Sequence, residues 1–286
     1  MTVFQAICLG FLQGIAEFLP ISSSGHLAVV QNLFGLEEVP LLFDVFLHLA
    51  TLASVVLYFR RKIGRLFCVL GRWITGKKQK EESVIQDDLI SGTDENGRKT
   101  IIAVLISTFV TAIIGIVTSK LIKDGTISIK ITCAGFLVTA CLLFVSSRIE
   151  KKRIADNSDT EKKPVSKFQA LFIGLMQGLG TLPGISRSGS TIAASQLCGV
   201  DRACAGEYSF IISIPAILGA FVLELKDLGE VSSSIGACPL IAGCAAAFAW
   251  GYLALSFLMK LIRRGKLEWF SLYLIPCGIL GMIFLK

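Results

Sequence analysis

The fold is decided by two related stretches, QGIAEFLPISSSGH (Gln13–His26) and QGLGTLPGISRSGST (Gln177–Thr191). A shift of 164 residues lays residues 9–36 over residues 173–200 without a gap, and nine of these 28 positions are identical. Each copy is apolar on both sides and is interrupted in its middle by proline, glycine and a serine cluster. Such self-similarity indicates that one supersecondary unit is present twice.

The composition around these copies is that of a membrane protein. Of the 286 residues 53% are hydrophobic and 17% charged, and the mean hydropathy is +0.70, whereas soluble domains carry about 25% charged residues. Several uncharged runs approach the roughly 20 apolar residues that a helix needs to cross a bilayer. We therefore predict an all-α polytopic membrane protein that forms one integral membrane domain over residues 1–286.

The basic residues predict how the chain is threaded. Of the 28 Lys and Arg residues, ten lie in Arg60–Lys99, seven in Arg148–Lys167 and four in Lys260–Lys266. By the positive-inside rule these three regions are cytoplasmic, with cytoplasmic loops expected at residues 76–99 and 148–167. Six spans then alternate across the membrane: Leu41–Phe59, Thr100–Leu121, Ile129–Ser147, Tyr208–Leu223, Cys238–Met259 and Trp269–Leu285.

Two apolar segments, Val3–Leu36 and Phe168–Val200, do not fit as simple spans. Both flanks of the first must be external and both flanks of the second cytoplasmic, so each is predicted to be a re-entrant helical hairpin. Repeat one (residues 1–147) and repeat two (residues 168–286) then each contain one hairpin and three spans. Because three crossings are an odd number, the second copy is expected to have inverted topology, with a site near the midplane where the broken helices meet.

The positions at which the two copies differ carry side chains that could bind phosphate or take part in catalysis. Glu17, Ser23 and His26 stand in the first copy where the second has Thr181, Arg187 and Ser190. Arginine binds phosphate oxygens bidentately, and glycine-flanked serine turns at helix N-termini aim backbone N–H groups at anions. Expected phosphate-binding residues are Ser22, Ser24, Gly25, Ser186, Arg187, Ser188, Gly189 and Thr191.

Glu17, Ser23, His26 and Arg187 are the predicted catalytic residues. Gln13 and Glu17 lie four residues apart on one helix face, and their oxygens suit a hard divalent cation, Mg²⁺ or Ca²⁺, whose shell phosphate oxygens complete. A bridge from Glu17 to Arg187 between the repeats is a compatible alternative. Three nucleophiles stay open: Ser23, His26 and a water molecule activated by Glu17.

The second histidine of the chain, His48, lies four residues after Asp44. We expect the two to form a hydrogen-bonded structural pair that faces the cavity.

Over essentially the whole chain the sequence resembles the undecaprenyl-diphosphatases, also called bacitracin-resistance proteins. The [Glu/Gln]-x3-Glu motif followed by Pro-x-Ser-Ser-x-Gly-His matches Gln13–His26, and Pro-Gly-x-Ser-Arg-Ser-Gly-x-Thr matches Pro183–Thr191. Many relatives have Glu where this chain has Gln13, which leaves Glu17 as the only acid of that motif.

The resemblance implies an enzyme that hydrolyses undecaprenyl diphosphate to undecaprenyl phosphate and inorganic phosphate. Such an enzyme recycles the lipid carrier for peptidoglycan synthesis and confers bacitracin resistance. The resemblance also implies a bacterial cytoplasmic (inner) membrane location, an active site that faces the extracytoplasmic side, and assistance by a divalent cation.

Two other functional classes share features with this sequence. Inverted repeats with broken helices are the architecture of secondary transporters, so a polyprenyl-phosphate or anion transporter or flippase stays an alternative, although such a carrier does not need Glu17 and His26. Another lipid-phosphatase superfamily requires a histidine after its arginine. No histidine follows His48 in this sequence, so the match to that superfamily fails. The basic residues are spread over loops, so no nucleic-acid partner is expected, and a homodimer is left open.

Overall fold

The computed structural model describes residues 1–36, 41–77, 90, 92–123, 128–156, 164–224 and 236–284. Its regular secondary structure is helical throughout these ranges. The helices are α1 (Val3–Phe18), α2 (Ser23–Leu33), α3 (Leu41–Tyr58), α4 (Arg60–Thr75), α5 (Asp94–Lys123), α6 (Ile129–Ala155), α7 (Lys167–Leu179), α8 (Arg187–Leu197), α9 (Arg202–Glu224), α10 (Ala237–Arg263) and α11 (Trp269–Phe284). Most of the loop expected at 76–99 and the centre of the loop expected at 148–167 lie outside the described residues.

Within the described part of the chain, four helices are long and apolar enough to cross a membrane: α5, α6, α9 and α10. A fifth span is added if α3 and α4, which meet at a bend of 77°, are counted together. The all-α, multi-pass membrane architecture predicted from the sequence is thereby confirmed.

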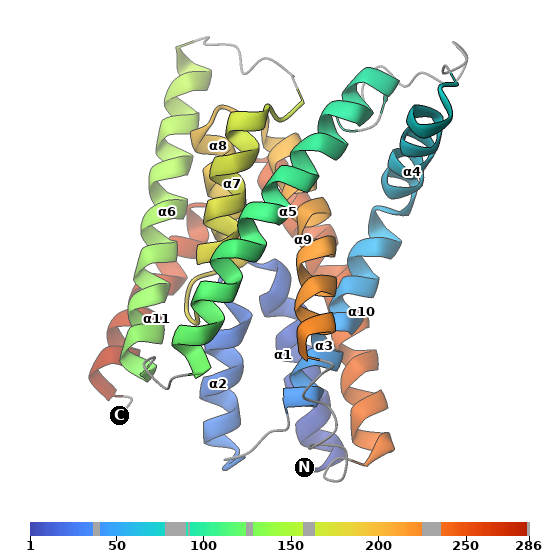
Figure 1. The fold of residues 1–286 in the computed structure, drawn as a ribbon. Helices are drawn as coiled ribbons and strands as arrows, with labels where there is room; N and C mark the ends of the chain where they lie inside the picture. Colours follow the sequence, from blue (N-terminus) through green and yellow to red (C-terminus); the bar gives the residue numbers. More distant parts are fainter. Residues whose placement is uncertain are drawn as a thin grey trace.

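The two repeated stretches fold as two helical hairpins, α1–α2 and α7–α8. Both begin with the same cap: Thr2 and Gln5 form a capping box at the start of α1, and Ser166 and Gln169 form one at the start of α7. These residues are again 164 positions apart, so the repeat extends beyond the stretch found in the sequence. In Figure 1 one hairpin occupies the lower half of the molecule and the other the upper half, with their turns between them.

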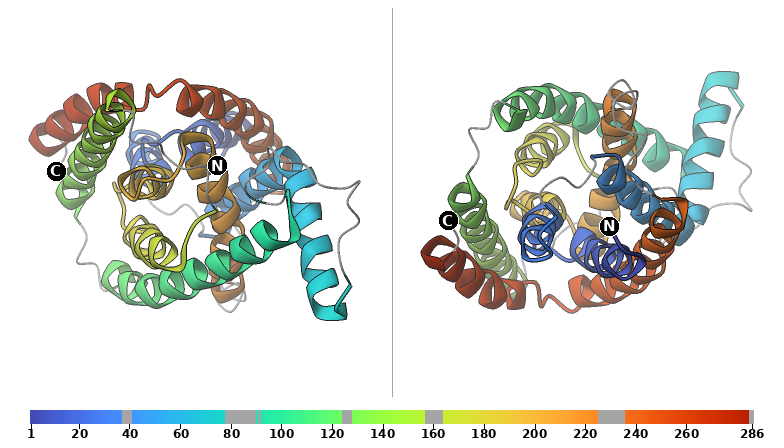
Figure 2. Two further views of the ribbon diagram at one scale, coloured as in Figure 1. Left: turned by 90° about the horizontal axis from the view of Figure 1, so that it is seen from above. Right: turned by 90° about the horizontal axis from the view of Figure 1, so that it is seen from below.

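Helices α5, α6, α10 and α11 form an outer wall around the hairpins, as the two end-on views show (Figure 2). The first arm of each hairpin packs against this wall almost backbone to backbone. A Cβ added at Gly10 of α1 would lie 2.1 Å from the carbonyl oxygen of Gly243 in α10. A Cβ at Gly174 of α7 would lie 2.7 Å from the backbone of Ser107 in α5. Small residues allow such close approach of helices in membranes.

Helix α4 lies where the sequence indicated only the start of a basic cytoplasmic stretch. The side of α4 that faces the protein carries the buried Val69 together with two paired basic residues. Lys62 pairs with Glu207 at 2.5 Å, and Arg72 pairs with Asp94. Phe67, on the outward side of α4, is 68% exposed. Five of the ten basic residues of Arg60–Lys99 thus belong to an amphipathic helix that bends away from α3 rather than to a loop.

Helices α5 and α6 extend beyond the spans expected from the sequence. α5 begins at Asp94 rather than Thr100, and α6 continues to Ala155 rather than ending at Ser147. Charged residues end an apolar run without ending a helix, so the uncharged runs underestimated both lengths.

Candidate active site

The turn of the first hairpin places Glu17 and Ser23 next to each other. Helix α1 ends at Phe18 and α2 begins at Ser23. Between them Ser22 has a φ of +67°, the only positive φ at a non-glycine position among the described residues. The sharp turn brings the Ser23 hydroxyl within 2.8 Å of the Glu17 carboxylate oxygen Oε2, to which it donates.

The turn of the second hairpin places Arg187 at the first position of α8. Gly184, with a φ of +87°, lies directly against the backbone of Thr132 in α6. Ser186 caps α8 by accepting the Gly189 N–H at 3.1 Å. Its hydroxyl is 3.2 Å from that of Ser188. The corresponding Ser22 and Ser24 hydroxyls of the first hairpin lie 3.4 Å apart, so the two turns share a serine pair.

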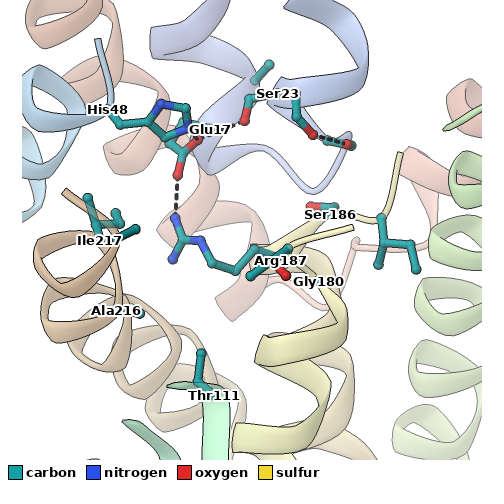
Figure 3. A pocket seen from close by; sticks show the side chains of 15 residues that line it. Glu17, Ser23, His48, Thr111, Gly180, Ser186, Arg187, Ala216 and Ile217 are labelled. Carbon is teal, nitrogen blue, oxygen red and sulfur yellow. Dashed lines mark hydrogen bonds and ion pairs between the residues drawn. The ribbon is translucent and has the colours of Figure 1, made fainter. Parts of the chain in front are cut away.

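Glu17 joins the two hairpins (Figure 3). Its Oε1 is paired with the guanidinium of Arg187. Its Oε2 accepts hydrogen bonds from Ser23 and from Gln13 Nε2 at 3.0 Å. Only 7% of Glu17 is exposed, and a buried charge of this kind requires a paired, hydrogen-bonded environment. The Glu17–Arg187 bridge that the sequence allowed is therefore present.

A cavity of about 160 Å³ opens beside this carboxylate. Its polar wall is formed by Glu17, Ser22, Ser23, Ser24, His48, Thr111, Thr181, Ser186 and Arg187. Its apolar wall includes Ala216, Ile217 and Ala220 of α9. Anion-binding donors thus line one side of the cavity and hydrocarbon lines the other, which is the combination that a lipid phosphate requires.

His48 of α3 is the cavity residue whose importance the sequence did not reveal. Its Nδ1 donates to the backbone carbonyl of Asp44 at 2.8 Å, and its Nε2 lies 3.6 Å from Glu17 Oε2. The expectation that His48 faces the cavity is confirmed. The Asp44 carboxylate instead accepts from Gln31 Nε2 at 3.0 Å, so the pair with His48 runs through the backbone.

His26, by contrast, is not among the residues that line the cavity. Its Nδ1 donates to the Ser22 carbonyl at 2.9 Å, and its Nε2 accepts from the hydroxyl of Tyr273 in α11 at 2.8 Å. Both ring nitrogens are therefore engaged by groups other than Glu17, Ser23 and Arg187.

The remaining predicted residues lie behind the cavity wall. A Cβ at Gly25 would lie 2.6 Å from the ring of Phe136. Thr191 Oγ1 donates to the backbone carbonyl of Arg187 at 2.9 Å. Ser188, Gly189 and Gln13 are likewise buried and absent from the cavity lining. These five residues support the turns, whereas Ser22, Ser24, Ser186 and Arg187 of the expected phosphate-binding set line the cavity.

A sequence profile of the family described as bacitracin resistance protein BacA matches residues 6–280, which include both turns. The chain belongs to this family. It is 47% identical to an undecaprenyl-diphosphatase of Treponema denticola, over 98% of this chain and 96% of that protein. Undecaprenyl-diphosphatases of Desulfosudis oleivorans and Methanobrevibacter smithii are 38% and 37% identical over 98% and 99% of this chain, and 97% and 96% of those proteins. The family resemblance noted in the sequence is thereby confirmed. The two signature motifs of the sequence are the two turns that meet at Glu17.

Proposed function

We propose that this protein hydrolyses undecaprenyl diphosphate to undecaprenyl phosphate and inorganic phosphate, and so recycles the lipid carrier of peptidoglycan synthesis and confers bacitracin resistance. The observation that carries the proposal is the meeting of Ser23, Glu17 and Arg187 in one cavity that is half polar and half apolar. Relatives that match over nearly the full length are named for this activity.

Arg187 binds the terminal phosphate in this mechanism. Its guanidinium lies at the cavity beside Glu17, and its planar fork matches two phosphate oxygens at once. The first turns of α2 and α8 add backbone N–H groups at the same place. Phosphoryl transfer is driven mainly by positioning and by stabilising charge on the equatorial oxygens, and these groups supply both.

Ser23 is the nucleophile that this geometry favours. Its Oγ attacks the terminal phosphorus as its proton passes to Glu17 Oε2, 2.8 Å away. The bond from that phosphorus to the bridging oxygen breaks, and undecaprenyl phosphate leaves. Glu17 then passes the serine proton to solvent through His48. Water attacks the phosphoserine, and its proton passes to Glu17. The bond from phosphorus to Ser23 Oγ breaks as Oγ takes that proton from Glu17, and inorganic phosphate departs. His48, 35% exposed, carries protons between Glu17 and solvent through Nε2.

A divalent cation, Mg²⁺ or Ca²⁺, fits as a companion of the substrate rather than as a resident ion. No three His, Cys, Asp or Glu side chains of the described ranges group as a metal site would need. Glu17 offers one carboxylate, and the buried Oε1 of Gln13 has no hydrogen-bond partner among the residues that the structure describes. Mg²⁺ is commonly bound by one or two carboxylates together with substrate phosphates. When bound, the cation neutralises charge on the diphosphate.

The fold that we propose for the membrane is an inverted repeat with six spans and two re-entrant hairpins. Each proposed span lies on one helix (α3, α5, α6, α9, α10 or α11). The matching capping boxes of α1 and α7 and their matching glycine contacts with α10 and α5 support the repeat. The repeats comprise residues 1–147 and 168–286.

The proposed location is the bacterial cytoplasmic membrane, with the cavity open to the extracytoplasmic side. The distribution of Lys and Arg supports this orientation.

The test is phosphate release from a polyprenyl diphosphate by the purified protein in detergent, without any gradient. We expect release by the wild type, none by Ser23→Ala, and full activity for Ser256→Ala, whose hydroxyl bonds within α10. An acid-stable phosphoprotein after quenching indicates a phosphoserine rather than the acid-labile phosphohistidine, and its absence from Ser23→Ala assigns it to Ser23. Lipid movement in vesicles without phosphate release would instead establish the transporter.

A further inference from the structure

The backbone of the first turn is strained at one position. Ser22 has a φ of +67°, a region that L-residues avoid. The equivalent residue of the second hairpin, Ser186, has an ordinary φ of −76°, and there the positive φ falls on Gly184. The second turn therefore uses glycine, whereas the first needs contacts that hold a serine in place. Ser23 follows directly in the chain, so the conformation of Ser22 determines where the Ser23 side chain lies.

The side chain of His26 supplies one of those contacts. Its Nδ1 lies 2.9 Å from the Ser22 carbonyl oxygen. A carbonyl oxygen can only accept, so Nδ1 carries the proton. The same carbonyl also accepts the backbone N–H of His26 at 3.3 Å. Two hydrogen bonds from one residue thus fix the carbonyl direction of the strained serine.

Tyr273 of α11 contacts the second ring nitrogen of His26, Nε2. Its hydroxyl is 2.8 Å from His26 Nε2. The neutral ring with its proton on Nδ1 has a lone pair on Nε2, which accepts the tyrosine proton. The two rings stack with centroids 5.7 Å apart and planes at 17°, and Phe136 lies 5.1 Å away on another side. The ring is held in orientation as well as in tautomer.

On this basis we propose that Tyr273 is a positioning residue for the phosphatase reaction. Through His26 it holds the Ser22 turn in its strained conformation, and the turn presents Ser23 Oγ to Glu17. This inference rests on the proposed function. It assigns His26 the same positioning role, in place of the proton transfer or attack expected from the sequence.

The test compares kinetics of the full-length protein with and without the Tyr273 hydroxyl. Tyr273→Phe keeps the ring and should lower kcat about tenfold with KM changed less than about twofold, because a displaced nucleophile slows chemistry more than binding. Tyr252→Phe is the matched control, since Tyr252 lies on α10 and its ring packs against Tyr58. We expect it to keep the wild-type kcat.

Substitutions at Ser22 separate positioning from general structural damage. Glycine adopts positive φ without cost, so Ser22→Gly should let the turn form without the hydrogen bonds from His26 and Tyr273. In that background Tyr273→Phe should change kcat by less than about twofold, whereas in Ser22→Ala, which keeps the strain, the loss of about tenfold should persist. An equal loss in both backgrounds overturns the proposal.

The tautomer of His26 can be measured without changing either His26 or Tyr273. The chain has two histidines, so ¹⁵N spectra of wild type and His48→Gln assign the His26 signals. We expect neutral His26 with its proton on Nδ1, and a proton on Nε2 overturns the proposal even if Tyr273→Phe does not fold. An inactive wild type contradicts the proposed function instead. An active wild type with full activity in Tyr273→Phe contradicts only the positioning role.

Discussion

Gly184 is the position where one added methyl group should displace Arg187. It lies three residues before Arg187, in the turn that begins α8. A Cβ built on Gly184 would lie 1.8 Å from the carbonyl oxygen of Thr132 and 2.7 Å from its carbonyl carbon. Both atoms belong to the backbone of α6, so no side chain can rotate away to make room.

The size of the effect follows from this contact. Real Cβ atoms essentially never lie closer than 3.0 Å to such an atom, so the turn must move by about 1 Å or more in Gly184→Ala. A misplacement of about 1 Å can reduce turnover about 100-fold. The φ of +87° adds about 1–2 kcal/mol of backbone strain, and overpacking adds about 1–3 kcal/mol.

Gly35→Ala provides the matched control. Gly35 has a φ of +63°, and an added Cβ would meet no atom of the described residues within 4 Å. It therefore carries the backbone strain, about 1–2 kcal/mol, without the collision. We expect Gly35→Ala to lower the thermal midpoint in detergent modestly and to release phosphate at the wild-type rate. If Gly184→Ala matches Gly35→Ala in both measurements, the contact with α6 does not position Arg187.

Three further outcomes are expected. Arg187→Lys should insert normally but lose about 2.7–4 kcal/mol of transition-state stabilisation, a fall of roughly 100- to 1,000-fold in turnover; activity within a few-fold of wild type would remove Arg187 from the site. Glu17→Gln should lower both the rate of phosphate release and the response of that rate to added Mg²⁺. His26→Ala should lower the rate and leave metal affinity nearly unchanged. A full rate and an unaltered metal requirement in Glu17→Gln would refute the role of the carboxylate. Single cysteines introduced in Arg148–Lys167 of a cysteine-free variant should react with impermeant reagents only from the cytoplasmic side, and labelling from outside intact cells would overturn the topology.

The sequence predicted the hairpins because their signal is local. The breaks at Pro20 and Pro183 and the identity of the two copies locate both turns without reference to the rest of the fold. The contact between Glu17 and Arg187 could also be predicted from the sequence. Each of these residues occurs in only one of the two copies, and the copies are expected to face each other. Helix α4 was missed because its basic residues were counted for topology, although its amphipathic pattern was available.

The surroundings of the two histidines could be predicted only in part, because the cavity-facing position of His48 was expected whereas the contact of His26 with Tyr273 was not. His26 directly follows the serine cluster, yet its ring turns to Tyr273, which is 247 residues away in the chain. His48 lies on a different helix, and its imidazole reaches the cavity because α3 packs beside both α1 and α9. Side-chain direction depends on the rotamer and on distant neighbours, and neither is encoded in the local pattern.

The pairing of Glu17 with Arg187 has a consequence for how the protein is made. The partners are separated by 170 residues, and ribosomes add about 5–20 residues per second. The carboxylate is therefore synthesised roughly ten to thirty seconds before its counter-ion. An unpaired charge at membrane depth is costly, so we expect the first hairpin to wait at the membrane surface and to sink into place only when the second arrives. Assembly of the two halves would then be the last event of biogenesis, and a chain truncated before Arg187 would leave Glu17 accessible to water.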